Sequence, residues 1–200
     1  MARRGRDRFA ASGKSIRELR VIGGAWRGRK WRFVAAPGVR PTPDRVRETL
    51  FNWLAARIGG AHCLDLFAGS GALGTEALSR GAADVMFVDR SAPLIDALRA
   101  RLRDWGATGR AHFAVADALE WLASGAAGVG RIDIAFLDPP FAGPPAESAL
   151  GAVIASGCLA RGAWVYLEQP ATAALALPRG WTIRRRGRAG AVGYYLLHES

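Results

Sequence analysis

The strongest constraint on the fold is an alternation of strand-like and helical patterns over most of the chain. Five short apolar runs have the length and composition of buried strands, at 62–67, 84–88, 111–115, 132–137 and 163–168. Apolar residues recur at helical spacing between these runs, at 72–80, 92–104, 117–123 and 146–156. This alternation is typical of a parallel sheet that carries helices on both faces.

Both ends of the chain depart from this pattern. Trp181–Arg188 and Val192–His198 predict two strands around Gly190 with no helix between them, and therefore an antiparallel hairpin. Near the start, Leu19–Ile22 and Arg29–Val34 predict a second, small hairpin. The expected fold is α/β and Rossmann-like, with a mostly parallel seven-stranded sheet, a C-terminal antiparallel hairpin and a small N-terminal extension.

A helix is predicted between the small hairpin and the sheet. Its apolar stripe consists of residues at helical spacing, namely Val46, Leu50, Trp53, Leu54 and Ile58. Thr42 can cap this helix with Pro43 at its first position, where the missing N–H of proline costs little.

The strand predicted at 132–137 ends in the tetrapeptide Asp138-Pro139-Pro140-Phe141. Because two prolines cannot continue a sheet ladder, the chain must turn there. An acid, a rigid turn and an aromatic ring thus lie at the carboxyl end of a strand, where open α/β sheets bind ligands. A planar ring could stack on Phe141 while its amino group donates to Asp138 and to a backbone carbonyl. The alternative is a plain turn whose Phe packs into the core.

A glycine-rich loop follows the first predicted strand of the sheet. It runs from Asp65 to Gly74 and has the G-x-G-x-x-G spacing of dinucleotide-binding folds. Acids stand at the ends of three successive strands, at Asp65, Asp89 and Asp117. Asp89 is placed to accept hydrogen bonds from a ribose diol and Asp117 from an adenine amino group, while Asp65 lies where an ammonium could bind. Each acid alone could instead cap a helix.

The charge of this loop favours one ligand over another. A dinucleotide needs donors for its pyrophosphate, which three acids would repel. S-adenosylmethionine carries a sulfonium, an ammonium and no phosphate, so it suits the acids better. A nicotinamide-dependent oxidoreductase remains the alternative that the glycine spacing suggests.

Positive charge is concentrated at the N-terminus. Residues 1–47 hold 14 Lys or Arg and three acids, which accounts for the whole net charge of +11. Such a block is typical of phosphate binding, although a solvated, disordered leader is the alternative for residues 1–17. Beyond the leader, basic residues alternate with aromatic ones, at Arg27, Arg29, Lys30 and Arg32 and at Trp26, Trp31 and Phe33. Such interleaving suits nucleic-acid bases as well as phosphates.

Together these motifs resemble the class I S-adenosylmethionine-dependent methyltransferases that act on exocyclic amino groups. The D-x-F-x-G-x-G loop at 65–71 and the D-P-P-F motif at 138–141 carry this resemblance. The segments Arg20–Lys30 and Arg40–Leu54 further resemble the RsmD family, which are bacterial enzymes that methylate guanine N2 in small-subunit (16S) ribosomal RNA. The likeness runs from about Arg20 to the C-terminus.

The resemblance implies which residues form the sites. The implied cofactor-binding residues are Asp65, Phe67, Gly69, Ser70, Gly71, Asp89, Asp117, Thr42 and Arg45. At the target base, Asp138 and the Pro139 carbonyl would accept the two amino N–H groups while Phe141 stacks on the ring. The implied RNA-binding residues are Trp26, Arg27, Arg29, Lys30, Arg32 and Arg40. The family often has Glu where this chain has Asp89, which is one methylene shorter and can still bind a diol.

The resemblance also implies the domain organisation and the partner. We expect 18–58 to form an RNA-binding hairpin and helix that cover the cofactor and 59–200 the methyltransferase domain, while residues 1–17, which fall outside the likeness, are expected to be a basic, disordered leader. The implied cofactor is S-adenosyl-L-methionine. The implied partner is 16S rRNA within the small ribosomal subunit, and we expect a monomer.

Composition indicates a cytoplasmic protein without metal. Cys63 and Cys158 lie in apolar surroundings and are expected to be reduced, and the three histidines are scattered. No apolar stretch could span a bilayer, and the basic N-terminus lacks the apolar core of a signal peptide.

Two further alternatives remain open. One is a DNA methyltransferase acting on adenine N6 or cytosine N4, although 200 residues leave little room for a sequence-reading domain. The other is a non-catalytic rRNA-binding assembly factor. The intact loop glycines and the intact D-P-P-F motif argue against it, since a degenerate site has no physical need of them.

Overall fold

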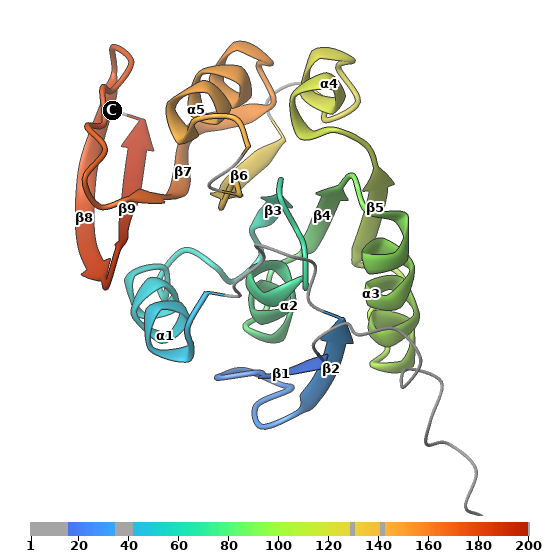
Figure 1. The fold of residues 1–200 in the computed structure, drawn as a ribbon. Coiled ribbons are helices and arrows are strands. Elements are labelled where there is room, and N and C mark those ends of the chain that lie inside the picture. The colour runs from blue at the N-terminus through green and yellow to red at the C-terminus, as the bar shows by residue number, and fades with distance from the viewer. Residues whose placement is uncertain (1–15, 35–41, 129–130, 141–142, 200) are drawn as a thin grey trace, which may run out of the picture.

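The computed structural model describes residues 16–34, 42–128, 131–140 and 143–199. Its main element is a seven-stranded sheet with the spatial order β5-β4-β3-β6-β7-β9-β8 (Figure 1). Its strands are β3 (His62–Asp65), β4 (Asp84–Asp89), β5 (Ala111–Val115), β6 (Ile132–Leu137), β7 (Leu159–Pro170), β8 (Trp181–Ala189) and β9 (Val192–Glu199). The helices are α1 (Asp44–Trp53), α2 (Ala72–Ser79), α3 (Ala92–Asp104), α4 (Ala118–Ala123) and α5 (Ala146–Ala155).

The strand directions follow the predicted topology. Strands β3 to β7 pair in parallel, whereas β9 pairs antiparallel to both β7 and β8. The order of β3 to β6 changes direction between β3 and β6, since β4 and β5 extend the sheet on one side and β6 and β7 on the other. The predicted α/β, Rossmann-like fold class with a C-terminal antiparallel hairpin is confirmed.

Helices cover both faces of the sheet. In Figure 1, α1, α2 and α3 lie on one face and α4 and α5 on the other. Alternate residues of each buried strand therefore enter different cores. Phe136 and Tyr166 pack with α1 and α2, whereas Leu137 and Leu167 pack with α5 on the opposite face.

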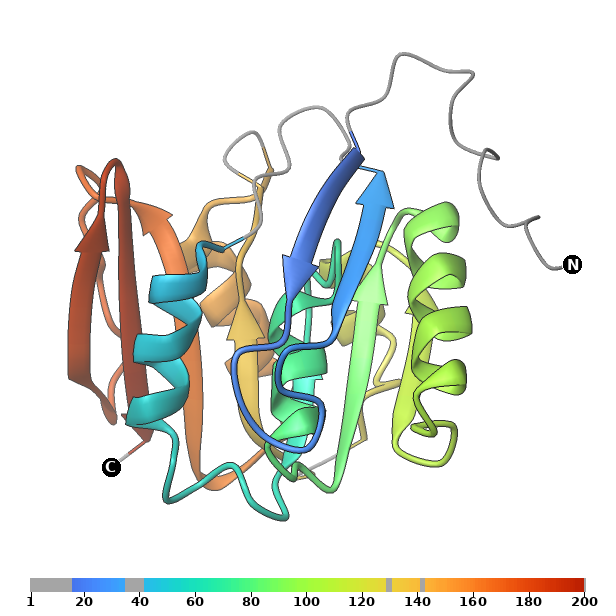
Figure 2. The same cartoon turned by 90° about the horizontal axis from the view of Figure 1, so that it is seen from below.

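A small antiparallel hairpin of β1 (Ile16–Arg20) and β2 (Lys30–Val34) packs outside α2 and beside α3 (Figure 2). Its turn is held by α2. The buried carboxylate of Glu76 accepts the backbone N–H groups of Ile22 and Gly23, each at 2.8 Å. One turn later in α2, the Ser79 hydroxyl donates to the Gly23 carbonyl at 2.6 Å. The backbone carbonyl of Ser79 accepts from the N–H of Ala25 at 2.7 Å.

Two arginines complete this attachment, and with Glu76 we call them the hairpin anchor. Arg80 Nε donates to Glu76 Oε1 at 2.8 Å, and Arg47 Nη1 of α1 lies 3.6 Å from Glu76 Oε2. Arg47 is fully buried and also donates to the Arg20 carbonyl at 2.9 Å and to Asp44 at 2.6 Å. The hairpin, α1 and α2 are thus joined around one carboxylate.

Two local predictions are wrong. The first hairpin strand covers Ile16–Arg20 rather than Leu19–Ile22, because Val21 and Ile22 already belong to the turn that Glu76 holds. Thr42 does not cap α1: the helix begins after Pro43 without a side-chain cap, and the Thr42 hydroxyl donates elsewhere. Ile16 and Arg17, assigned to the leader, lie in β1, and the rest of the leader is outside the described residues.

Among the described residues, no helix combines the length and the apolar character needed to cross a bilayer. Within the same part of the chain, no group of three or more His, Cys, Asp or Glu side chains forms a candidate metal site. Cys63 and Cys158 are both buried and unpaired.

Candidate active site

Acidic side chains gather at the carboxyl edge of the large sheet. Asp65 ends β3, Asp89 ends β4, and Asp138 directly follows β6. Parallel pairing aligns these strands, with Asp65 opposite both Phe87 and Phe136. This edge includes the place beside β3 where the strand order changes direction, which is where open α/β sheets bind their ligands.

The glycine-rich loop connects β3 to α2 and is folded by two of these acids. Asp65 accepts the N–H of Gly74 at 2.9 Å, and Asp89 accepts the N–H of Gly69 at 2.7 Å. Gly71 donates to the Ala68 carbonyl and has a φ of 75°; a Cβ there would lie 2.5 Å from Leu98. Glycine is therefore the residue that can adopt this backbone conformation here without strain or a clash with Leu98.

These bonds decide between the two ligands that the sequence left open. The backbone N–H groups of all three glycines, Gly69, Gly71 and Gly74, donate to acceptors within the protein itself. A pyrophosphate would need such donors, and it would also meet the carboxyls of Asp65 and Asp89. A cationic ligand without phosphate fits this donor and acceptor set, as S-adenosylmethionine does.

Burial sets the protonation of Asp65. The side chain is only 3% exposed, and desolvation raises its pKa from 3.8 to about 7, with the nearby charge of Asp89 adding to the rise and the Gly74 bond opposing it. Asp65 therefore takes up and releases its proton near neutral pH.

Asp117 and Asp89 also shape their own surroundings. Asp117 is the N-cap of α4, and its Oδ1 accepts from Leu119 and Glu120. Its Oδ2 accepts no hydrogen bond from the described residues, so one oxygen stays free for a ligand. Asp89 uses Oδ1 for Ser91 and Oδ2 for Gly69. The capping role considered for Asp117 is thus real and compatible with ligand contact.

Asp138 belongs to a buried cluster that the sequence analysis did not find. Leu137 pairs with Leu167, which places Asp138 beside Glu168 on the face covered by α1. The Thr42 hydroxyl lies 3.0 Å from Glu168 Oε1 and 3.3 Å from Asp138 Oδ2. The Tyr166 hydroxyl donates to the same Glu168 oxygen at 2.6 Å. We call Asp138, Glu168, Thr42 and Tyr166 the acid cluster.

The acid cluster holds its carboxyls without a cation. Desolvation, followed by the charges of Glu168 and Asp65, raises the pKa of Asp138 well above its usual value. Desolvation also raises the pKa of Glu168, although the hydroxyls of Tyr166 and Thr42 stabilise its charged form. No arginine or lysine among the described residues forms an ion pair with either carboxyl.

The remaining predicted site residues are placed as follows. Pro139 is buried, Phe67 is half-buried and Ser70 is buried in the glycine loop, while Arg45 is exposed on α1. The carbonyl of Pro139 accepts no hydrogen bond within the described part of the chain. Phe141 and Arg40 lie outside the described residues.

The basic hairpin separates into an exposed and a buried set. Its predicted RNA-binding cations are exposed, namely Arg27, Arg29, Lys30 and Arg32. Trp26 and Trp31 are buried instead, at 7% and 5% exposure, and pack against Trp105 with ring centroids 5.5 and 5.9 Å away. Arg110 lies over the Trp26 ring and Arg101 over the Trp31 ring, at 5.9 and 5.4 Å from the ring centroids. The expected stacking of bases on Trp26 does not fit this arrangement, because the ring is already covered.

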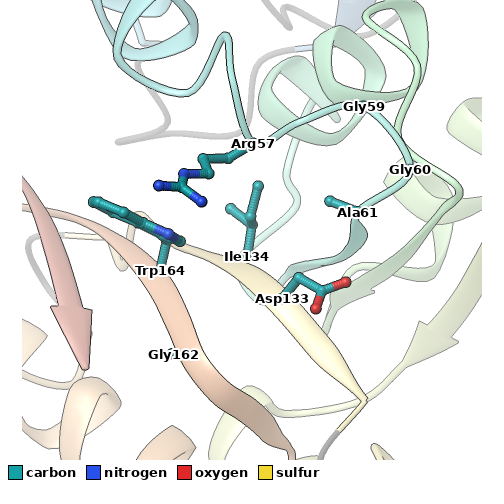
Figure 3. A pocket seen from close by; sticks show the side chains of 8 residues that line it. All are labelled: Arg57, Gly59, Gly60, Ala61, Asp133, Ile134, Gly162 and Trp164. Carbon is teal, nitrogen blue, oxygen red and sulfur yellow. The ribbon is translucent and has the colours of Figure 1, made fainter. Parts of the chain in front are cut away.

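Two surface hollows lie away from this edge. One, of about 270 Å³, is lined by Arg57, Asp133 and Trp164, and Figure 3 shows Arg57 reaching over the Trp164 ring. It opens near the amino ends of β3 and β6, opposite the acids. The other is lined by Ile183, Arg184, Arg185 and Arg186 on the edge strand β8. The site is assigned by its chemistry, since neither hollow contains any of the acids described above.

The fold, the glycine loop and the acids at the strand ends define an S-adenosylmethionine-dependent methyltransferase of the Rossmann-like class. Comparison with known proteins agrees. The chain is 43% identical over 180 residues to ribosomal RNA small subunit methyltransferase D of Escherichia coli, covering 90% of this chain and 89% of that protein. It is 38% identical to the protein of the same name from Haemophilus influenzae, with 90% and 93% covered.

A solved structure and a family model extend this result. A putative methyltransferase from Escherichia coli matches with a TM-score of 0.79 at 38% identity, covering 92% of this chain and 98% of that one. The model of the family described as conserved hypothetical protein 95 matches residues 19–198. The chain belongs to this family, and the resemblance inferred from its motifs is confirmed.

Proposed function

We propose that the protein transfers a methyl group from S-adenosylmethionine to the exocyclic N2 of a guanine in small-subunit ribosomal RNA. One observation carries this proposal: the half-buried Asp138 carboxyl and the Pro139 carbonyl, which accepts no hydrogen bond from the described residues, lie together at the carboxyl end of β6, beside the glycine loop. Two acceptors at adjacent residues match the two N–H groups of one amino group. The names of two similar relatives, at 43% and 38% identity, support ribosomal RNA as the substrate.

The chain's own residues would act mainly by alignment. The lone pair of a guanine amino group is delocalised into the ring, so the nitrogen is a poor nucleophile. Acceptance of its two N–H groups by Asp138 and Pro139 favours a pyramidal nitrogen and stabilises the positive charge that develops there. Alignment alone can supply effective molarities of roughly 10⁵ M or more. When bound, S-adenosylmethionine supplies an electrophilic methyl group whose transfer leaves the C–S electron pair on sulfur.

The cofactor contacts are part of the same proposal. Asp89 would accept from the ribose diol, Asp117 Oδ2 from the adenine amino group, and Asp65 would face the ammonium. Gly69, Ser70, Gly71 and Phe67 would line the loop side, with Thr42 and Arg45 next to them. Phe141 would stack on the target base.

The exposed cations of the hairpin would hold the RNA around the target. Because Trp26 and Trp31 are covered, the proposal assigns Arg27, Arg29, Lys30, Arg32 and Arg40 to phosphates rather than to base stacking. The target guanine must leave its stack or come from a loop before it can reach Asp138. We further propose that the protein is a monomer and that the substrate is the small subunit rather than free RNA.

The test is transfer of radiolabelled methyl from S-adenosylmethionine to small ribosomal subunits purified from cells that lack this protein, followed by nucleoside analysis. The expected product is labelled N2-methylguanosine. Parallel reactions with naked ribosomal RNA and with duplex DNA separate the remaining substrates. Label in N6-methyladenine or N4-methylcytosine of DNA, with none in ribosomal RNA, would contradict the proposal.

A further inference from the structure

The acid cluster contains one more carboxyl than the proposed chemistry uses. Asp138 is assigned to the target amino group, but Glu168 is 5% exposed and has no assigned partner outside the cluster. A buried carboxylate without a cation is costly. Its position next to Asp138 therefore calls for an explanation in terms of the chemistry of Asp138.

The hydrogen bonds of the cluster indicate where a proton sits. The hydroxyl of Thr42 has one hydrogen and two carboxyl neighbours, at 3.0 Å in Glu168 and 3.3 Å in Asp138. Because this hydrogen points to one carboxyl at a time, a hydroxyl that donates to Glu168 is withdrawn from Asp138, whose charged form it would otherwise stabilise. Tyr166 also donates to Glu168, at 2.6 Å. Among the described residues, Glu168 has two donors and Asp138 has none besides Thr42, which favours the charge on Glu168 and the proton on Asp138.

We propose that Glu168 is a positioning residue that, through its negative charge and the shared Thr42 hydroxyl, makes Asp138 a stronger proton acceptor for the methylated amino group. The inference rests on the proposed function of Asp138. After the nitrogen lone pair forms the N–C bond, the nitrogen carries one surplus proton. The Asp138 carboxylate takes this proton, the N–H pair returns to nitrogen, and the product amine is neutral. A neighbouring negative charge increases the affinity of Asp138 for that proton.

The charged and titratable groups that face Asp138 disfavour its charged form, with the exception of Thr42. Glu168 and Tyr166 face it from β7 and Asp65 from β3, and Tyr194 of β9 stands behind Tyr166. The carboxyls of Glu168 and Asp65 disfavour a second negative charge on Asp138, and the Tyr166 hydroxyl, which donates to Glu168, keeps that charge on Glu168. Thr42 alone favours the charged form of Asp138 by donating to it. Replacing Glu168 and replacing Thr42 should therefore shift the pKa of Asp138 in opposite directions.

The experiment is the pH dependence of kcat/KM for methyl transfer to small subunits, because a pH profile reports the free enzyme's essential base. For wild type, the rate should rise with pH to a plateau as Asp138 loses its proton. Glu168→Gln keeps the shape and removes the charge, so the acidic limb should move to lower pH by about one unit, which is about tenfold in the active fraction at low pH. The plateau should fall because Asp138 becomes a weaker base.

Thr42→Val keeps the volume and removes the hydroxyl, so its acidic limb should move to higher pH. Glu48→Gln, an exposed glutamate of α1, is the control and should leave the profile unchanged. An unmoved acidic limb in Glu168→Gln, or movement of both variants in one direction, would overturn the role of Glu168 even if the activity fell. Such a loss alone would indicate a purely structural residue.

A second readout separates this inference from the proposed function. In protein labelled with ¹³C at the Asp side-chain carboxyl, the Asp138 carbon can be titrated by NMR without any substrate. Its midpoint should fall in Glu168→Gln and rise in Thr42→Val. If these shifts occur but no N2-methylguanosine forms, the result would support the proposed effect of Glu168 and Thr42 on Asp138 and contradict the proposed substrate. Formation of N2-methylguanosine without these shifts would contradict the role of Glu168 alone.

Discussion

Two buried glutamates of this protein have opposite surroundings. Glu76 in the hairpin anchor accepts two backbone N–H groups and faces Arg80 and Arg47, so every bond it makes holds elements together. Glu168 in the acid cluster faces hydroxyls and a second carboxyl, with no cation among the described residues. Burial alone therefore does not distinguish a structural acid from a functional one. The partners do, because a carboxylate paired with cations stabilises the fold, whereas a carboxyl held only by hydroxyls beside a second carboxyl has a changed affinity for protons.

The two clusters are joined through the chain. The hairpin anchor fixes α1 and α2, while α2 begins at the glycine loop and Thr42 precedes α1 by two residues. The position of Thr42 relative to Asp138 thus depends on the salt-bridged network that α1 enters through Arg47. The N-terminal hairpin is therefore linked to Thr42 through α1 and α2 rather than being an isolated extension of the sheet.

The largest effect should follow from breaking the hairpin anchor. Glu76→Ala leaves the fully buried Arg47 without its second carboxylate and removes the acceptors of two backbone N–H groups. The free energy of unfolding should fall by about 3–5 kcal/mol, measured by urea denaturation. Glu18→Ala, which removes an exposed partner of Lys30, should change it little and is the matched control. Equal effects of the two variants would show that the anchor does not hold the hairpin.

Replacing Asp65, another buried acid without a cationic partner among the described residues, should change how the stability of the protein depends on pH. The folded-state pKa of Asp65 is raised from 3.8 to about 7. The contribution of Asp65 to the free energy of unfolding is therefore fully present below pH 3.8 and is lost as the pH rises to about 7. At about 1.4 kcal/mol per pH unit, the loss amounts to at most about 4 kcal/mol. Asp65→Asn keeps an acceptor for the Gly74 N–H and removes this loss. It should therefore be more stable than wild type at pH 8 and similar at pH 4 in urea unfolding. A difference independent of pH would contradict the shifted pKa.

The smallest effect is expected on the basic hairpin surface. Arg27→Ala removes one exposed cation, so the affinity for the small subunit should fall modestly, and the slope of log K against log salt should decrease by about 1. Arg161→Ala, an exposed arginine near the amino end of β7, is the control. Binding titrations at several salt concentrations measure both. An unchanged slope in Arg27→Ala would exclude this arginine from the phosphate contacts.

Most of the sheet could be predicted because its signals are local. Each apolar run between turns became a strand, and the acids at 65, 89 and 138 follow from strand ends that any parallel sheet brings to one edge. Glu168 could have been found in the same way. It is the last residue of the run predicted at 163–168, and Asp65 and Asp89 are likewise the last residues of β3 and β4. The signal was present, but the residue lies outside the recognised motifs.

The partners of the tryptophans and of Thr42 could not be predicted, because they depend on contacts between distant segments. Trp26 and Trp31 alternate with arginines in the sequence, as base-stacking residues would. Only the packing against Trp105, more than 70 residues later, turns them inward. Thr42 has the sequence context of a helix cap, yet its hydroxyl meets Glu168, 126 residues away. Local capping rules cannot detect such a competing acceptor.

The most direct test of the account compares methyl transfer and cofactor binding in the same preparation of Asp138→Ala, with Asp133→Ala at the other end of β6 as the control. We expect Asp138→Ala to lower the rate of N2-methylguanosine formation by a factor on the order of 10² or more while S-adenosylmethionine binds with nearly wild-type affinity. Asp133→Ala should retain both. Methylation by Asp138→Ala near the wild-type rate would contradict the central claim that the carboxyl after β6 receives the target amino group.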